Sequence, residues 1–334
     1  MALRRWCCGF LMVLGLGPGS WLSAQVLVKS QEKVVFLGDS ITAQGWTNAH
    51  GYVQLVVAGL KANGVNITPL PAGIGGQQSN DMLARLQRDV LAPKPEWVMI
   101  SCGMNDVIHG AKGVPLEQYK INMTEMVTRC QAAGIKVILC TTTTAGSAES
   151  AATQQLGIYS DFLRSLAKQR QCTLIDLYPV FVEVLRQKDT LHGLTGDGVH
   201  MTPEGNMLMA QTILSGMGCT AAQVATARET WLDLPGAGTI TTRVDVELNQ
   251  KFFTATCPLT LRQRERLFLV VAAAKRPTLN HWAKEKLLAL MKQKVKPQGT
   301  YDALEDLFAS TVKSKVQAEL QQEFVAEINQ AVAR

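Results

Sequence analysis

The sequence lacks the short motifs by which most metal and nucleotide sites are identified. It contains no C-x-x-C and no H-E-x-x-H, and its five histidines are widely dispersed. The glycines at 73–76 do not complete G-x-G-x-x-G, because residue 78 is Gln, and no Lys-Ser or Lys-Thr follows as a P-loop requires. A flavin or nucleotide binder of the flavodoxin type is disfavoured, because Gly38-Asp39-Ser40 is too short for a phosphate loop. We therefore expect no metal and no cofactor.

The chain also lacks a strong excess of either charge. It carries 33 Lys and Arg against 27 Asp and Glu, a net charge of +6, and the basic residues are scattered along the sequence. Binding to nucleic acid or to a membrane surface depends on a concentrated basic patch. We therefore predict no nucleic-acid partner.

Long apolar runs are missing as well, apart from one near the start. Arg4 and Arg5 precede an apolar stretch at 6–16, and Leu22-Ser23-Ala24 follows it, which is the pattern of a secretory signal peptide. The stretch is shorter than the ~20 residues of a membrane-spanning helix. We predict that residues 1–24 are removed and that the protein is exported to the periplasm or outside the cell, without stable membrane insertion.

The sequence has few cysteines, and it does not determine whether or how they pair. Six remain after residue 24, and six cysteines allow fifteen sets of pairs, among which the sequence does not choose. Cys102 and Cys140 lie inside apolar runs, where a buried thiol fits the pattern as well as a disulfide does.

From residue 33 to about 217, short apolar runs alternate with longer amphipathic ones. Strands separated by helix-length segments form parallel βαβ units with helices on both faces of the sheet. The pattern predicts an α/β fold, a doubly wound, flavodoxin-like sheet of five parallel strands, in one domain over 25–217. The expected strands are 34–37, 66–70, 97–102, 136–141 and 173–176, and the expected helices are 51–62, 79–91, 116–133, 152–169 and 204–216.

The composition changes after Leu234. We predict a linker over 218–240 and a mainly helical extension over 241–334, beginning with a short strand or hairpin near 240–254. Apolar residues recur every four positions over 301–333, which indicates a helix with an apolar stripe. Packing of this stripe on its own domain and a homodimer formed through it are both consistent with the pattern.

Polar groups follow three of the predicted strands, and a fourth group precedes the last helix. They are Gly38-Asp39-Ser40, the segment 73–79, Gly103-Met104-Asn105-Asp106 and Asp197-Gly198-Val199-His200. Each alone would be a helix cap, a turn or a structural histidine. The carboxyl ends of parallel strands meet at one edge, so together the groups supply a hydroxyl nucleophile, a base, an acid and backbone donors. These are the requirements of acyl transfer.

The four groups resemble the sequence blocks of the SGNH (GDSL-type) hydrolases: FLGDSIT, AGIGGQQS, GMND and DGVH followed by MTPEG. The resemblance covers residues 33 to about 217. It implies that Ser40 is the nucleophile and that His200 and Asp197 complete a catalytic triad. It also implies that Gly76 and Asn105 are oxyanion donors beside the Ser40 N–H.

The glycine block differs from that of many relatives in its first residues, and the choice of donor glycine within it stays open. It begins with Pro71-Ala72, where many relatives carry Asn, and Gly75 or Gly73 replaces Gly76 as donor if the block is shifted. Asp39, Trp46 and His109 are candidate pocket residues because they lie close to Ser40 or to Asn105 in the sequence. Packing or surface roles for Trp46 and His109 are equally consistent with the pattern.

The resemblance implies a carboxylic ester hydrolase with a small-molecule or glycan ester as substrate. Export and the habits of the family favour removal of acetyl groups from carbohydrates. Hydrolysis of lysophospholipids or of small acyl and aryl esters is the alternative. An inactive glycan-binding protein on the same fold is a third hypothesis, but such a protein is expected to lose Ser40, His200 or Asn105, and all three are present.

Overall fold

A five-stranded parallel sheet forms the centre of the protein. The computed structural model describes residues 26–186, 194–234, 238–245 and 252–259. The strand order is β2-β1-β3-β4-β5, which is the flavodoxin-like order, and the predicted fold class is confirmed. The strands are β1 (Lys33–Gly38), β2 (Thr68–Gly73), β3 (Trp97–Ser101), β4 (Lys136–Cys140) and β5 (Thr173–Ile175).

Helices cover both faces of this sheet. Four of the predicted helical segments correspond to one helix each, and the segment 79–91 divides into α3 and a π-helical turn, η1. The helices are α1 (Ser40–Thr47), α2 (Tyr52–Ala62), α3 (Ser79–Leu86), η1 (Gln87–Leu91), α4 (Met104–Ile108), η2 (Gly110–Lys112), α5 (Leu116–Ala132), α6 (Ala151–Arg170), α7 (Leu177–Arg186), α8 (Pro203–Gly216) and α9 (Ala221–Leu232).

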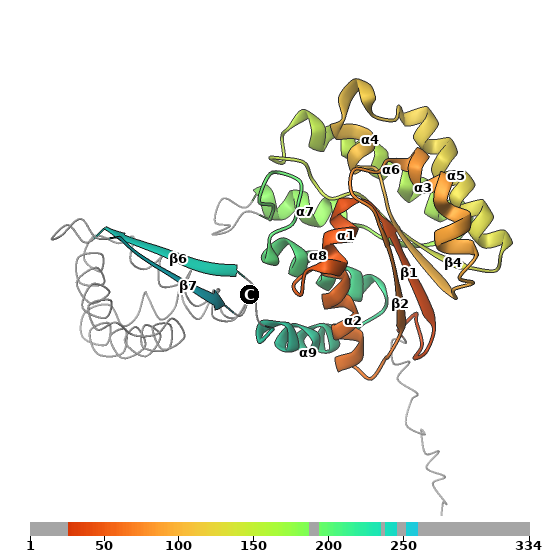
Figure 1. The fold of residues 1–334 in the computed structure, drawn as a ribbon. Helices are drawn as coiled ribbons and strands as arrows, with labels where there is room; N and C mark the ends of the chain where they lie inside the picture. The colour runs from red at the N-terminus through yellow and green to blue at the C-terminus, as the bar shows by residue number, and fades with distance from the viewer. Residues whose placement is uncertain (1–25, 187–193, 235–237, 246–251, 260–334) are drawn as a thin grey trace, which may run out of the picture.

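The three inner strands β1, β3 and β4 are mostly apolar because alternate residues enter opposite cores. In β1, Val34 and Phe36 belong to one apolar cluster, while Val35 and Leu37 belong to the other. The first cluster contains buried residues of α1, α2, α8 and α9, and the second contains buried residues of α3, α5 and α6 (Figure 1). Two complete layers of helices therefore fix the sheet whose carboxyl edge carries the polar groups.

The linker predicted at 218–240 is wrong over most of its length, because it contains α9. Thr220 caps this helix together with Gln223, and Trp231 is fully buried. The helix packs against α2 at Gly59, where a Cβ atom would lie 2.9 Å from the Cβ of Ala227. The α/β domain therefore extends beyond residue 217, to at least Leu232.

A two-stranded antiparallel hairpin follows, where a strand or hairpin is predicted. It consists of β6 (Gly238–Asp245) and β7 (Phe252–Leu259). The predicted signal peptide and the predicted helical stripe at 301–333 lie outside the described residues, so the homodimer through that stripe stays a prediction. Within the described part, no helix combines the length and apolar character needed to cross a membrane.

The cysteines whose side chains the structure describes are all free thiols. Cys102 and Cys140 are buried in the two cores, as one of the two interpretations of their apolar runs predicts. Burial raises the pKa of the Cys140 thiol to about 12, so it is protonated at neutral pH. These two residues therefore contribute packing, and neither supplies a thiolate.

Candidate active site

Ser40 lies at the junction of β1 and α1. Asp39 is the N-cap of α1, and its Oδ1 accepts a hydrogen bond from the Ile41 N–H at 2.9 Å. Gly38 has no space for a side chain, because a Cβ atom would lie 2.0 Å from Thr42 Oγ1. The strand therefore turns directly into the helix, and Ser40 is held at the carboxyl edge of the sheet, beside the β1/β3 switch point where ligands bind in such folds.

The structure brings Ser40, His200 and Asp197 into one chain of hydrogen bonds. His200 Nε2 lies 2.9 Å from Ser40 Oγ, and His200 Nδ1 lies 2.6 Å from Asp197 Oδ2. Asp197 Oδ1 also accepts the backbone N–H groups of Val199 at 3.0 Å and of His200 at 2.7 Å. These hydrogen bonds hold the pKa of Asp197 well below its usual range; the bond with the His200 ring is the largest cause, and the two N–H groups are smaller ones.

An ionised Asp197 fixes the state of the imidazole. It accepts a hydrogen bond from the Nδ1–H of His200, and the proton stays on Nδ1, so the lone pair of Nε2 faces the hydroxyl of Ser40. The side chains of His200 and Asp197 are 33% and 58% exposed, so this side of the site is open to solvent. The arrangement is suited to removing a proton from Ser40 while a large molecule approaches from outside.

Backbone hydrogen bonds hold the loop that carries His200. Gly196 N donates to the carbonyl of His200 at 2.9 Å, and Thr202 N donates to that of Leu194 at 3.0 Å. Gly146, in the loop after β4, donates to the carbonyl of Gly198 at 2.8 Å. The loop is therefore closed on itself and attached to a neighbouring strand end.

The loop with the glycine block passes beside Ser40. A Cβ atom on Gly75 would lie 3.9 Å from the Cβ of Ser40, so the loop backbone is close to Ser40. Gly76 has a positive φ of 74° and open space around its Cα, whereas Gly73 ends β2 and packs against the backbone of α1 at Ala43. The loop geometry therefore leaves Gly75 and Gly76 as the glycines free to face a ligand.

Asn105 lies on α4 and is almost fully buried. Its side-chain amide donates one hydrogen to the carbonyl of Gln77 at 2.9 Å, next to Gly76. An amide nitrogen carries two hydrogens, so the second is available to a ligand. The Ser40 N–H lies in the first turn of α1, where helix N–H groups have no partner within the helix.

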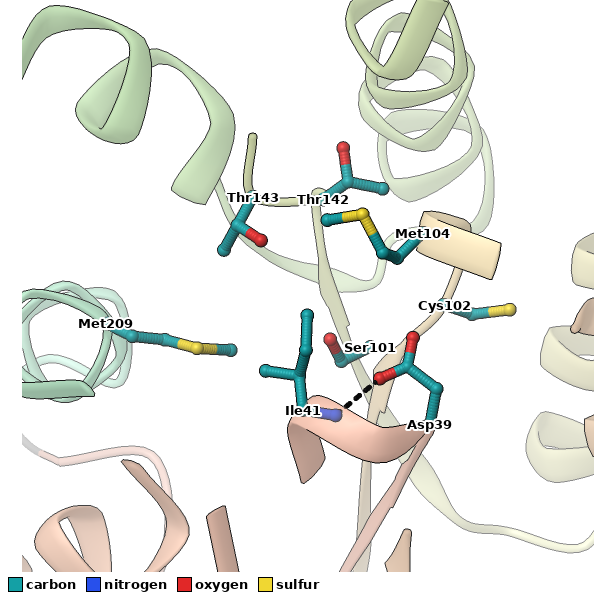
Figure 2. A pocket seen from close by; sticks show the side chains of 8 residues that line it. All are labelled: Asp39, Ile41, Ser101, Cys102, Met104, Thr142, Thr143 and Met209. Carbon is teal, nitrogen blue, oxygen red and sulfur yellow. Dashed lines mark hydrogen bonds between the residues drawn. The ribbon is translucent and has the colours of Figure 1, made fainter. Parts of the chain in front are cut away.

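The three candidate pocket residues lie in different environments. Asp39 is buried and lines a small cavity of about 10 Å³ with Ile41, Met104 and Thr143, shown in Figure 2, which is too small to admit an ester substrate. Trp46 does not line this cavity and packs against the core on the α2 side. His109 is exposed at the end of α4, with its Nδ1 3.0 Å from Gln78 Nε2.

Sequence reasoning missed Arg85, which contacts the end of the strand that leads into Ser40. Its guanidinium donates to the carbonyl of Gly38 at 2.9 Å and to that of Ala72 at 2.8 Å, and it pairs with Asp89 at 2.8 Å. Arg85 therefore ties together the carboxyl ends of β1 and β2. A signal was present, because Arg85 occupies a position on the apolar stripe of the 79–91 helix, between Met82 and Leu86.

The described part of the chain contains no group of three or more His, Cys, Asp or Glu side chains placed to bind a metal ion.

Comparison with known proteins gives consistent matches. The model of the GDSL-like lipase/acylhydrolase family matches residues 36–208. An acetylxylan esterase from Geobacillus stearothermophilus is 30% identical over 213 residues, covering 57% of this chain and 96% of that protein. An arylesterase from Vibrio mimicus is 25% identical over 187 residues, covering 55% of this chain and 88% of its own.

Solved structures extend the match to the fold. The crystal structure of an acetylxylan esterase from Geobacillus stearothermophilus aligns with a TM-score of 0.53 at 28% identity, covering 58% of this chain and 97% of that one. The family model spans more than half of the chain, and the resemblance predicted from the four sequence blocks is confirmed. The protein belongs to the GDSL-like lipase/acylhydrolase family and is a carboxylic ester hydrolase of the GDSL type.

Proposed function

We propose that the protein is an exported serine esterase that removes acetyl groups from carbohydrates through an acyl-enzyme intermediate. The observation that carries the proposal is the chain of hydrogen bonds from Asp197 through His200 to Ser40. This arrangement gives a hydroxyl nucleophile, a base that contacts it and an ionised carboxylate that orients the base.

In the first half of the reaction, Ser40 Oγ attacks the carbonyl carbon of the ester and its proton passes to His200 Nε2. Asp197 stabilises the imidazolium that forms. The negative charge on the former carbonyl oxygen is received by the N–H groups of Ser40 and Gly76 and by the second amide hydrogen of Asn105. His200 then gives its proton to the departing alcohol, which leaves an acyl group on Ser40.

In the second half, water takes the place of the alcohol. His200 removes a proton from this water as it attacks the acyl carbon, and the same donors stabilise the second tetrahedral intermediate. When the bond to Ser40 Oγ breaks, the proton on His200 returns to Oγ and the carboxylic acid leaves. The enzyme is then back in its starting state, and one water has been consumed for each ester.

The solvent exposure of His200 and Asp197 supports a large, polar alcohol as leaving group. His200 must reach the alcohol oxygen, and a glycan can approach from this open side without entering a deep pocket. Acetylxylan esterases are among the relatives in both sequence and structure. Export is supported by the signal-peptide pattern at 1–24.

A fluorophosphonate probe followed by a panel of esters tests the proposal. The probe should label the protein but not Ser40→Ala, because only an activated serine reacts. The panel contains acetylated xylan, acetylated pectin fragments, acyl p-nitrophenols and lysolipids, with acetate release from the glycans expected to give the highest kcat/KM. Absence of labelling would favour the inactive glycan-binding alternative and contradict the proposed mechanism.

A second candidate, hydrolysis of lysophospholipids or of small acyl and aryl esters, is favoured by one feature of the surface. Ile74 and Ile108 are 37% and 36% exposed, and each lies within three residues of a proposed oxyanion donor. Apolar side chains at such positions suit an apolar acyl or aryl group. In the panel, faster turnover of lysolipids or aryl esters than of acetylated glycans would favour this candidate.

A further inference from the structure

The proposed oxyanion donors come from different segments of the chain. Gly76 lies in the loop between β2 and α3, and Asn105 lies on α4 after β3. Both must face the same oxygen, and catalytic groups need to be held within ~0.5 Å of their productive positions. Some part of the structure must therefore fix the distance between these two segments.

Gln78 spans the gap from the side of the glycine loop. Its side-chain nitrogen lies 2.8 Å from the carbonyl oxygen of Lys112, 3.0 Å from His109 Nδ1 and 3.5 Å from the carbonyl oxygen of Asn105. The amide has two hydrogens, so the two shorter contacts are the ones it satisfies. The backbone N–H of Gln78 donates to Asp81 Oδ2 at 3.0 Å, which anchors the residue at the start of α3.

Asp106 makes the matching connection inside the protein. Its Oδ1 accepts hydrogen bonds from the Ser79 N–H at 3.0 Å and from Ser79 Oγ at 2.5 Å. Asp106 is 3% exposed and Ser79 is fully buried. Asn122 donates to Ser79 Oγ at 3.0 Å and so connects the pair to α5. Burial raises the pKa of Asp106, which agrees with its place in the interior.

We propose that Gln78 and Asp106 are positioning residues that hold the glycine loop and α4 at the separation the oxyanion hole requires. Asp106 follows Asn105 directly, and Gln78 follows Gln77, whose carbonyl accepts the hydrogen bond from Asn105 Nδ2. Neither side chain contacts the reacting atoms. The inference rests on the proposed function, and it assigns His109 to the support of Gln78.

The variant Gln78→Met tests the outer connection, because it keeps the length of the side chain and removes its hydrogen bonds. Gln131→Met is the matched control: Gln131 Nε2 also donates to a backbone carbonyl, that of Arg170 at 2.7 Å, at the opposite edge of the sheet. We expect kcat to fall about 10-fold in Gln78→Met with little change in KM, which is less than the ~10²-fold loss from a 1 Å misplacement. The control should retain its kcat.

A double-mutant cycle with Asn105→Ala separates positioning from general stabilisation. When the Asn105 donor is absent, Gln78→Met should cost less than about 2-fold in kcat, because the group it positions is gone. Asp106→Asn should behave in the same way in the same cycle. Losses that multiply independently of Asn105, or an unchanged kcat in Gln78→Met, would overturn the proposal.

Stability measurements and a nucleophile variant complete the test. Gln78→Glu has the same length and replaces the donor by an acceptor, so it should lower kcat as Gln78→Met does. If both variants lose activity only in proportion to unfolded protein, the role is structural and the proposal fails. Ser40→Ala is measured in parallel: if it keeps its turnover, the proposed mechanism fails, whereas an inactive Ser40→Ala with a normal Gln78→Met overturns only the positioning role.

Discussion

Replacing Asp39 by Asn should stabilise the protein, and by more at neutral pH than at acidic pH. Asp39 is 2% exposed, and its pKa is raised from 3.8 to about 6, chiefly by burial and in smaller part by repulsion from Asp106. The hydrogen bond from the Ile41 N–H opposes this shift only partly. An Asn side chain keeps an oxygen for that N–H, so the cap of α1 should survive.

The sign of this pH dependence follows from whether the folded or the unfolded state holds the proton on Asp39. Between pH 4 and 6 the folded protein keeps a proton on Asp39 that the unfolded chain has released, so the free energy of unfolding falls as pH rises through this window. A pKa difference of about 2 units corresponds to about 3 kcal/mol of destabilisation above both pKa values. At pH 4.5 only about 1 kcal/mol of it has developed, so the advantage of Asn should be about 2 kcal/mol greater at pH 7.5.

Urea unfolding of the two proteins at pH 4.5 and pH 7.5 measures this difference. The comparison within each pH cancels the titration of groups that do not interact with Asp39, including Asp197, whose lowered pKa contributes with the opposite sign. Glu125→Gln makes the same carboxylate-to-amide change on the exposed surface of α5 and serves as the control. Equal effects of Asp39→Asn at the two pH values would refute the reasoning, because the buried carboxylate would then ionise without cost.

The remaining predictions concern the mechanism and the core. Ser40→Ala and His200→Ala should each lower kcat for a short-chain ester by several orders of magnitude, as triad removal does in serine hydrolases, while circular dichroism shows a folded protein. Asn105→Ala should cost ~10²–10³ in kcat with a much smaller change in KM, which steady-state kinetics will show. Trp231→Ala should lower the free energy of unfolding by ~3–5 kcal/mol, because it removes a fully buried side chain between α9 and α2.

The sheet could be predicted because its strands are buried on both faces. The apolar run at 34–37 fits a central strand, where both of its faces are buried, and β1 contains it. The least accurate strand was the one expected at 66–70, which the structure places at Thr68–Gly73. Pro69 and Pro71 suggest an end to a strand, but β2 is at the edge of the sheet, where a missing N–H costs no ladder hydrogen bond.

Helix α9 was missed for a different reason. Pro235 and Gly236 mark the end of a helix, but the residues before them carry only a weak apolar stripe, and the segment was assigned to a linker. The sequence did contain a start signal, Thr220 followed three residues later by Gln223, which is a capping box. The burial of Ala227 and Trp231 stabilises α9, and the absence of a side chain at Gly59 on α2 allows this close packing. No local pattern in the sequence of α9 reports a glycine on another helix.

Some residues of the polar site could be predicted from local sequence patterns, and others could not. Ser40 and Asn105 follow neighbouring parallel strands, so the strand order places them at the same edge of the sheet. Asp197 and His200 are three residues apart, so their contact with each other could be predicted, and the same edge of the sheet is where His200 meets Ser40. Arg85, which holds the backbone near Ser40, looks like an ordinary helix residue until the fold buries it. A buried ionisable group is costly unless its partners are present, so an arginine on an otherwise apolar helix stripe is itself an indication of such partners. Here those partners are the carbonyl groups at the ends of β1 and β2, the two strand ends that lead into Ser40 and the glycine loop.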